Sequence, residues 1–398
     1  MAQGVKQDEE YAGVKPIEER HRIDEASLDR WMQQHVEHYM GPLNVLQFRG
    51  GQSNPTYRID TSGASYVVRR KPFGKLLPSA HAVDREFRII SALHKQGFPV
   101  ARPYALCIDD EVIGSAFYVM SMEEGRVFSN PTLQSQSRQD RRLIFTDKIK
   151  TLARLHGYNP GEIGLGDFGK PGNYFARQID RWTKQYRASA IEVIPEMDRL
   201  IEWLPRTVPQ QERVSVVHGD YRLDNMIFHP TEPRVIAVLD WELSTLGDPM
   251  ADFTYLLMQW VMEGLKGADL ARLNIPTLEE AADIYCEAAG RPSVPDINWY
   301  LSYNLFRLAG ITQGIAARIR DGSRIGRSKC PPCDGVVELR PRSWRNLGAA
   351  LEPAPNGCVF VEYWRRWGCY RHRYDLFSTR QRKKRHEHGK GSGRTNPN

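Results

Sequence analysis

Two acidic residues and an amide near the middle of the chain have a spacing typical of phosphoryl-transfer sites. Residues 216–228 read VVHGDYRLDNMIF, so Asn225 follows Asp220 by five positions. The loop H-R-D-x-x-x-x-N has this spacing, and in it the aspartate orients an acceptor hydroxyl while the asparagine holds magnesium. A second segment, residues 235–252, places Asp240 directly after the apolar run VIAVL. We therefore predict Asp220 as a catalytic residue, and Asn225 and Asp240 as magnesium ligands.

The elements around these residues are expected to bring them to one cleft. In both segments β-branched apolar residues run directly into the acid, so a strand would deliver each carboxylate to its end. Magnesium prefers one or two carboxylates together with substrate phosphates. Arg222 is predicted to offset charge on the transferred group, although it could instead pair with Asp224. The simpler alternative for the acids is that they cap turns, as aspartate often does.

Hydrophobic periodicity predicts an α+β protein with two lobes. The smaller lobe is a five-stranded sheet with one inserted helix at 84–94, preceded by an amphipathic helix over 28–40. The larger lobe is mainly helical, interrupted by short strands at 214–217, predicted to pair with 226–228, and at 235–239. The expected divisions are a polar lead and helix at 1–42, a nucleotide-binding lobe at 43–122, a helical catalytic and acceptor-binding lobe at 123–322, and a tail at 323–398.

Several motifs in order give the chain a specific resemblance. From about residue 23 to 322 it resembles aminoglycoside phosphotransferase-like kinases of the choline and aminoglycoside kinase superfamily, and it is most similar to the phosphotransferase domains fused to some acyl-CoA dehydrogenases. The motifs are FRGGQSNPTYRI, LLPSAHAVDREFRII, FYVMSMEEGRVF, ARLH, HGDYRLDN, LDWELSTLGDP and FRLAGITQGIAARI. The resemblance implies a bilobal protein-kinase-like fold, ATP with Mg²⁺, and phosphorylation of a small-molecule hydroxyl.

The turn between the first two strands of the small lobe is a candidate phosphate loop. It contains Gly50, Gly51, Ser53 and Asn54. Glycine removes the Cβ obstruction, so backbone N–H groups can approach phosphates. A plain hairpin turn is the alternative interpretation.

The resemblance also assigns nucleotide contacts elsewhere in the small lobe. Arg69 stands where the superfamily has a lysine that contacts the phosphates, with Glu86 as its partner. This is a departure, because the arginine fork differs in shape from a lysine ammonium; an exposed basic cluster is the alternative. Met120 and Met122 would form the hinge whose backbone meets adenine, although a strand ending in a linker explains them equally well.

Other motifs are assigned structural rather than catalytic roles. Gly164, Gly166 and Gly169 spell G-x-G-x-x-G, but a turn precedes them instead of a buried strand, so we predict a glycine-rich loop. Asp252 is predicted to brace the catalytic loop, and His218 to be a structural hydrogen-bonding residue. One predicted helix carries Trp182, Gln185 and Tyr186. These side chains could line an acceptor pocket or pack in the core, and the sequence leaves both interpretations open.

The net charge of +7 is concentrated near the C-terminus. Residues 323–398 hold 17 basic and 6 acidic residues, which leaves 38 basic and 42 acidic residues before them. The charge therefore argues against a nucleic-acid partner for the body of the protein. Four of the six cysteines also lie in this tail, for which a zinc site, a basic arm and a poorly ordered appendage are the alternatives, and the appendage is favoured.

These features together predict a cytoplasmic small-molecule kinase. Before residue 323 only two scattered cysteines occur, and the sequence has no apolar run long enough for a membrane span. The predicted acceptor is a hydroxyacyl-CoA or related hydroxy acid, with a functional link to an acyl-CoA dehydrogenase, as the resemblance implies. A nucleotide-binding, pseudokinase-like protein without turnover is the alternative.

Overall fold

An antiparallel sheet forms the N-terminal lobe of the computed structural model, which describes residues 13–49, 54–72, 82–170, 172–191, 193–262, 264–294 and 296–320. The sheet has six strands in the order β1-β2-β3-β4-β6-β5. Their bounds are β1 Val14–Lys15, β2 Asn44–Phe48, β3 Thr56–Asp60, β4 Ser65–Arg70, β5 Pro103–Cys107 and β6 Phe117–Ser121. Five strands were predicted. The sixth is β1, whose two residues pair with Phe48 and Gln47 and are too few to show a period in the sequence.

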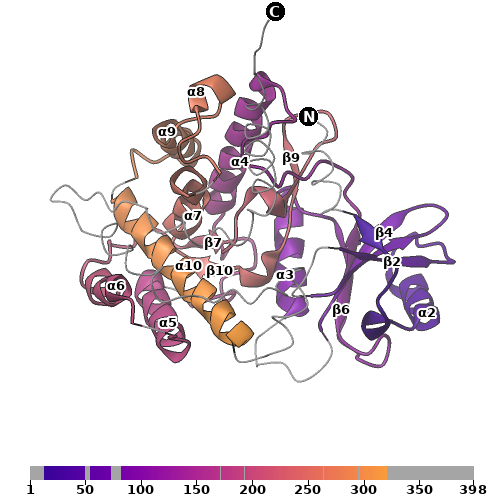
Figure 1. Cartoon of the computed structure of the whole chain (residues 1–398). Coiled ribbons are helices and arrows are strands. Elements are labelled where there is room, and N and C mark those ends of the chain that lie inside the picture. Colours follow the sequence, from indigo (N-terminus) through magenta and orange to yellow (C-terminus); the bar gives the residue numbers. More distant parts are fainter. Residues whose placement is uncertain are drawn as a thin grey trace, which may run out of the picture.

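Two helices pack on this lobe in different ways (Figure 1). Helix α2 (Glu25–His35) follows a short 3-10 turn, η1 (Glu19–His21), and is capped by Asp24, whose side chain accepts a hydrogen bond from the Ser27 N–H. It buries Leu28 and Met32 in the same apolar cluster as the strands. Helix α3 (Val83–Lys95) contacts β5 and β6 of the sheet, while its buried apolar residues belong to the apolar core of the larger lobe. The helix that carries Glu86 is therefore anchored to both halves of the molecule.

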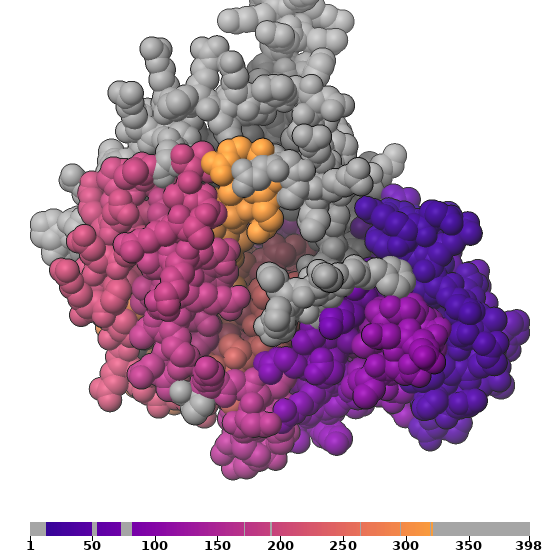
Figure 2. Space-filling view, turned by 90° about the horizontal axis from the view of Figure 1, so that it is seen from below, coloured from indigo at the N-terminus to yellow at the C-terminus, as the bar shows by residue number. Residues whose placement is uncertain are grey.

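The larger lobe is mainly helical. In Figure 1 its helices lie on the side of α3 away from the sheet, and Figure 2 shows the two lobes side by side, indigo to purple for the N-terminal one and pink to orange for the other. The helices are α4 Arg138–Gly157, α5 Tyr174–Ala188, α6 Pro195–Arg206, α7 Met250–Val261, α8 Leu270–Leu273, α9 Leu278–Ala289 and α10 Ile297–Arg320. The predicted α+β architecture with two lobes is confirmed.

Four short strands frame the segments that carry the candidate site, and their pairing differs from the predicted one. Strand β7 (Ser215–Val217) pairs with β10 (Thr245–Gly247), not with β8. Strand β8 (Met226–Phe228) pairs with β9 (Val235–Val238). Two 3-10 turns, η2 (Leu223–Asn225) and η3 (Trp241–Leu243), reverse the chain between these strands. The three-residue β10 gave no periodic signal, so the sequence offered β7 no other visible partner.

The glycine-rich segment joins the two lobes. The Arg85 guanidinium donates a hydrogen bond to the Phe168 carbonyl at 2.7 Å and lies 4.1 Å from the centre of that ring. Arg88 donates to the Gly164 carbonyl at 2.9 Å and pairs with Asp167. No strand leads into this segment among the described residues, so it is a loop packed on α3, as predicted.

Several predicted features lie outside the described residues. These are Gly50, Gly51 and Ser53 of the candidate phosphate loop, and the whole tail at 323–398 with its four cysteines. Within the described ranges, no helix has the length and apolar character needed to cross a membrane.

Candidate active site

The carboxylate of Asp220 is held by donors from three directions. The Tyr255 hydroxyl donates to its Oδ1 atom at 2.8 Å, and Nε of Arg222 lies 3.0 Å from the same oxygen. The Asn225 amide donates to Oδ2 at 3.0 Å and to the Asp220 carbonyl at 2.9 Å. The Asp220 side chain keeps 20% of its surface exposed, so it is oriented and still reachable by a small molecule.

Asp252 holds the backbone segment that leads to Asp220. The carboxylate of Asp252, 1% exposed, accepts hydrogen bonds from the N–H groups of His218 and Gly219. Gly219 has φ of +86°, and a Cβ there would lie 2.7 Å from the Leu243 carbonyl oxygen, so no other residue fits without a shift. Asp252 thus braces the loop, as the sequence predicted.

His218 also serves the loop structurally. Its Nε2 atom donates to the Leu239 carbonyl at 2.8 Å, and its Nδ1 atom accepts the Asp220 N–H at 3.2 Å. Both ring nitrogens are therefore engaged by backbone groups, and the ring is fully buried. The geometry agrees with the predicted structural role.

The two predicted metal ligands lie on adjacent backbone. The Leu239 N–H donates to the Asn225 carbonyl at 2.9 Å, which brings Asn225 beside the residue that precedes Asp240. Asp240 adopts a left-handed conformation, with φ of +64°, and leaves 35% of its side chain exposed. No group of three His, Cys, Asp or Glu side chains suited to a metal occurs in the described part of the chain. One carboxylate and one amide oxygen fit magnesium that takes its other ligands from phosphates and water.

Arg69 connects the small lobe to Asp240. Its side chain is 9% exposed, with Nε 2.7 Å from Glu86 Oε2 and Nη2 2.7 Å from Asp240 Oδ1. Burial lowers the pKa of Arg69, but the charges of Glu86, Tyr118 and Asp240 outweigh this and raise it above its ordinary value. The side chain is therefore a buried cation between two acids, and the alternative of an exposed basic cluster is wrong.

Glu86 also accepts hydrogen bonds from two other side chains of the small lobe. The Asn54 amide donates to its Oε1 atom at 2.8 Å, and the Tyr118 hydroxyl donates to its Oε2 atom at 3.1 Å. Asn54 is fully buried, so its side chain supports Glu86 and is not directed into solvent. Asn54, Arg69 and Glu86, predicted from separate motifs, form one cluster.

The predicted hinge residues lie where the sheet ends. Met120 pairs with Val67 near the end of β6, and the Met122 N–H donates to the Ser65 carbonyl at 3.4 Å just beyond it. Both side chains are half-buried. Met120 therefore belongs to the sheet, and Met122 begins the segment that runs on to α4.

Arg222 contacts Asp224, the partner that the sequence gave as the alternative, and it also contacts Asp220. Its guanidinium pairs with Asp220 and lies 3.4 Å from Asp224 Oδ2, while 44% of the side chain stays exposed.

Trp182 and Tyr186 are buried in the core of the larger lobe, in line with core packing.

Sequence reasoning missed two residues that contact the catalytic loop. Tyr255 follows Asp252 by three positions on α7, so both lie on the face that meets the loop. That spacing was a usable signal. Arg307 on α10 donates to the Gly219 carbonyl at 2.6 Å, and it stands in one of the quoted motifs without any spacing that marks it.

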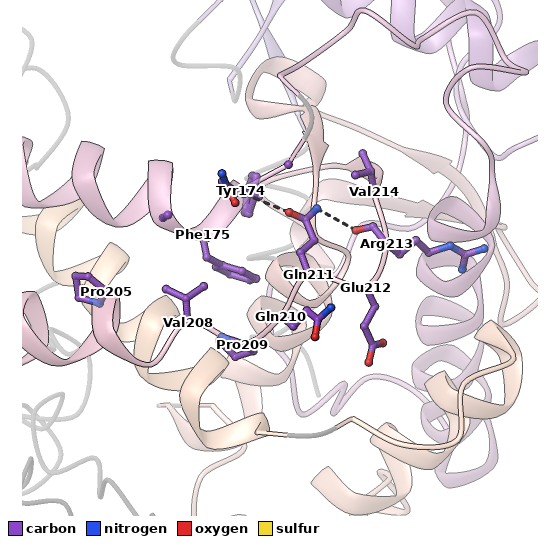
Figure 3. A pocket seen from close by; sticks show the side chains of 13 residues that line it. Tyr174, Phe175, Pro205, Val208, Pro209, Gln210, Gln211, Glu212, Arg213 and Val214 are labelled. Carbon is purple, nitrogen blue, oxygen red and sulfur yellow. Dashed lines mark hydrogen bonds between the residues drawn. The ribbon is translucent and has the colours of Figure 1, made fainter.

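One pocket of the larger lobe lies away from these residues. It encloses about 580 Å³ between the start of α5, the end of α6 and the segment before β7 (Figure 3). Gln211 crosses it, accepting the Tyr174 N–H at 3.3 Å and donating to the Arg213 carbonyl at 3.0 Å. None of the predicted site residues lines this pocket, so it is not part of the candidate active site.

Comparison with known proteins identifies the family. Residues 44–291, more than half of the chain, match the phosphotransferase enzyme family. The chain belongs to this family. Acyl-CoA dehydrogenase family member 10 of Mus musculus is 42% identical over 317 residues, covering 78% of this chain and 30% of that protein. Family member 11 of Homo sapiens is 39% identical over 329 residues, covering 80% of this chain and 42% of that protein. The chain therefore spans less than half the length of these curated relatives.

Solved structures show the same fold for this phosphotransferase-family protein. A Ralstonia eutropha structure described as an aminoglycoside phosphotransferase is 50% identical, with a TM-score of 0.71, over 76% of this chain and 91% of that one. A macrolide 2'-phosphotransferase from Brachybacterium faecium is 16% identical, with a TM-score of 0.50, over 76% of this chain and 95% of that one, and shows the fold alone. The predicted kinase-like fold is thereby confirmed.

Proposed function

We propose that this protein is a magnesium-dependent kinase that transfers the γ-phosphoryl group of ATP to a hydroxyl of a small molecule. The observation that carries the proposal is the grouping of Asp220, Asn225 and Asp240 through side-chain and backbone hydrogen bonds, with Arg69 reaching Asp240 from the other lobe. Membership of the phosphotransferase family supports the reaction type.

The chain's own residues suit the steps of this reaction. Asp220 orients the acceptor hydroxyl and takes its proton as the oxygen attacks phosphorus, while the bond from phosphorus to the bridging oxygen breaks. Arg222, half-exposed beside Asp220, offsets charge on the phosphoryl oxygens. Asn225 and Asp240 would hold magnesium, which supplies positive charge to the phosphates when bound. Arg69 and the loop at 50–54 would hold the nucleotide from the small lobe, and Met120 and Met122 its base.

The proposed acceptor is a hydroxyacyl-CoA or a related hydroxy acid. Similarity to proteins named acyl-CoA dehydrogenase family members supports this choice over an aminoglycoside. The same similarity supports a functional link to an acyl-CoA dehydrogenase, and the scattered cysteines before residue 323 support a cytoplasmic setting.

An acceptor screen tests the proposal. The purified protein is incubated with γ-labelled ATP, Mg²⁺ and, separately, hydroxyacyl-CoAs, free hydroxy acids and an aminoglycoside. We expect labelled product with a hydroxyacyl compound and none without Mg²⁺. Transfer only to the aminoglycoside would overturn the acceptor class. ATP binding without transfer to any acceptor or to water would favour the alternative of a nucleotide-binding protein without turnover.

A further inference from the structure

Two residues outside the predicted site contact Asp220 or its backbone. The Tyr255 hydroxyl donates to Asp220 Oδ1 at 2.8 Å. Arg307 donates to the carbonyl of Gly219, the residue immediately before Asp220, at 2.6 Å. They come from α7 and α10, so two helices remote in sequence from the loop converge on the Asp220 side chain and on the backbone just before it.

The two residues also contact each other. The Arg307 guanidinium lies 5.2 Å from the centre of the Tyr255 ring and 5.8 Å from that of Trp182. Arg307 is 7% exposed, so this cation is held between aromatic faces and a backbone carbonyl with little contact with water. The phenol of Tyr255 is thus fixed on one side by the Arg307 contact and on the other by its hydrogen bond to Asp220.

The Tyr255 phenol is a permanent donor in this setting. Burial and the neighbouring Asp220 carboxylate raise the pKa of Tyr255 above its ordinary value, so its proton stays on the oxygen. With Asn225 donating to Oδ2, the two carboxylate oxygens of Asp220 receive donors from opposite ends of the group. Rotation of the carboxylate would break at least one of these hydrogen bonds.

We propose that Tyr255 is a positioning residue for Asp220, and that Arg307 holds both the Tyr255 ring and the loop carbonyl so that the carboxylate keeps one orientation. The inference rests on the proposed function, because Asp220 is taken there as the residue that receives the hydroxyl proton. Misplacing a catalytic group by about 1 Å can slow a reaction about a hundredfold. The effect should therefore fall on kcat and leave nucleotide binding unchanged.

The first test is kinetic and uses the full chain. Hydrolysis of Mg·ATP, in which water takes the place of the acceptor hydroxyl, is compared for wild type, Tyr255→Phe and Tyr57→Phe. Tyr57 is a matched control, because its buried hydroxyl donates to the His21 carbonyl at 2.7 Å in the other lobe. We expect Tyr255→Phe to lower kcat about ten- to a hundredfold with KM for ATP within about twofold, and Tyr57→Phe to leave both near wild type. An unchanged kcat in Tyr255→Phe would overturn the inference.

The second test does not depend on turnover. With 3-fluorotyrosine at position 255, the ¹⁹F resonance reports the environment of the phenol. We expect it to shift in Asp220→Asn and in Arg307→Met, but not in Asp180→Asn, whose carboxylate is exposed and pairs with Lys184 on α5. A resonance that does not respond to Asp220→Asn would overturn the inference whether or not the protein transfers phosphate. Absence of wild-type turnover together with the expected shift would instead count against the proposed function alone.

Discussion

Nη2 of Arg69 lies 2.7 Å from Oδ1 of Asp240, so a strand of the small lobe and the end of β9 in the large lobe are joined by one ion pair. The same guanidinium pairs with Glu86, whose side chain is 2% exposed. Breaking a buried pair from one side leaves the other charge uncompensated. The Arg69 contact is therefore expected to matter for stability as well as for the nucleotide.

Replacing Arg69 with Met should destabilise the fold by about 3 kcal/mol, because Glu86 is left buried without its cation. Chemical denaturation measures the change. Arg69→Met with Glu86→Gln should recover part of the loss, since the unpaired charge is gone. Arg58→Met, which removes a pair with Asp60 that is about one-third exposed, is the control and should change stability by less than about 1 kcal/mol. Equal losses in the two single variants would contradict the buried ion pair.

The hydrogen bonds between Asp252 and the catalytic loop give a second prediction. Asp252→Asn keeps one acceptor oxygen but turns an NH₂ group toward a backbone N–H of His218 or Gly219. We expect a loss of about 1–3 kcal/mol in the free energy of unfolding, the cost of leaving a buried group unsatisfied. Asp180→Asn, in an exposed pair with Lys184 on α5, serves as the control and should lie within about 0.5 kcal/mol of wild type. A loss in Asp252→Asn no greater than in the control would contradict the bracing role.

Lys148 should make stability depend on pH. It is fully buried between the rings of Phe145 and Trp260, donates to Gln259, and burial lowers its pKa from 10.5 to about 7. Between these values the unfolded chain binds a proton that the folded chain does not, so the free energy of unfolding rises with pH.

The size of the effect follows from the same shift. From pH 7 to pH 9 the Lys148 contribution should add about 2 kcal/mol, because one pKa unit corresponds to about 1.4 kcal/mol. Denaturation of wild type and Lys148→Met at both pH values isolates it, with the exposed Lys184→Met as control. If wild type and Lys148→Met show the same change with pH, the lysine is not buried in its neutral form.

The glycine-rich loop at 164–169 should affect stability and not the nucleotide. Gly164 has φ of +76°, so alanine there meets backbone strain although nothing lies within 4 Å of its Cβ. We expect Gly164→Ala to destabilise by about 1–2 kcal/mol and to leave KM for ATP unchanged. Gly157→Ala, with open space and no positive φ, is the control. A raised KM for ATP in Gly164→Ala would assign the loop to the nucleotide after all.

Much of the fold was predictable because its signals are local. The period of 2 in Tyr57 and Ile59 and the apolar face of α3 each lie within one element. The pairing of β7 with β10 was not predictable, since it depends on how η3 reverses the chain and on three residues without a pattern. The two-residue β1 was missed for the same reason.

The candidate site also contains residues that the sequence predicts and residues that only the structure reveals. The sequence predicts Asp220, Asn225 and Asp240, because their spacing lies within one short stretch. Tyr255 is marked only by its spacing of three from Asp252 on α7, and Arg307 has no spacing that marks it, because it reaches the loop from a helix that only tertiary packing brings near. The Arg69 pair with Asp240 spans 171 positions, and no period in a sequence carries such a contact.

The central claim is that Asp220 receives the hydroxyl proton during phosphoryl transfer. Its most direct test is the rate of label transfer from γ-labelled ATP by wild type and Asp220→Asn, with ATP affinity measured in parallel by calorimetry and Asp224→Asn as the loop control. Loss of a general base should slow transfer about 10²- to 10⁴-fold, with ATP affinity within about threefold of wild type and Asp224→Asn much less affected. Transfer by Asp220→Asn at a rate near that of wild type would contradict the account.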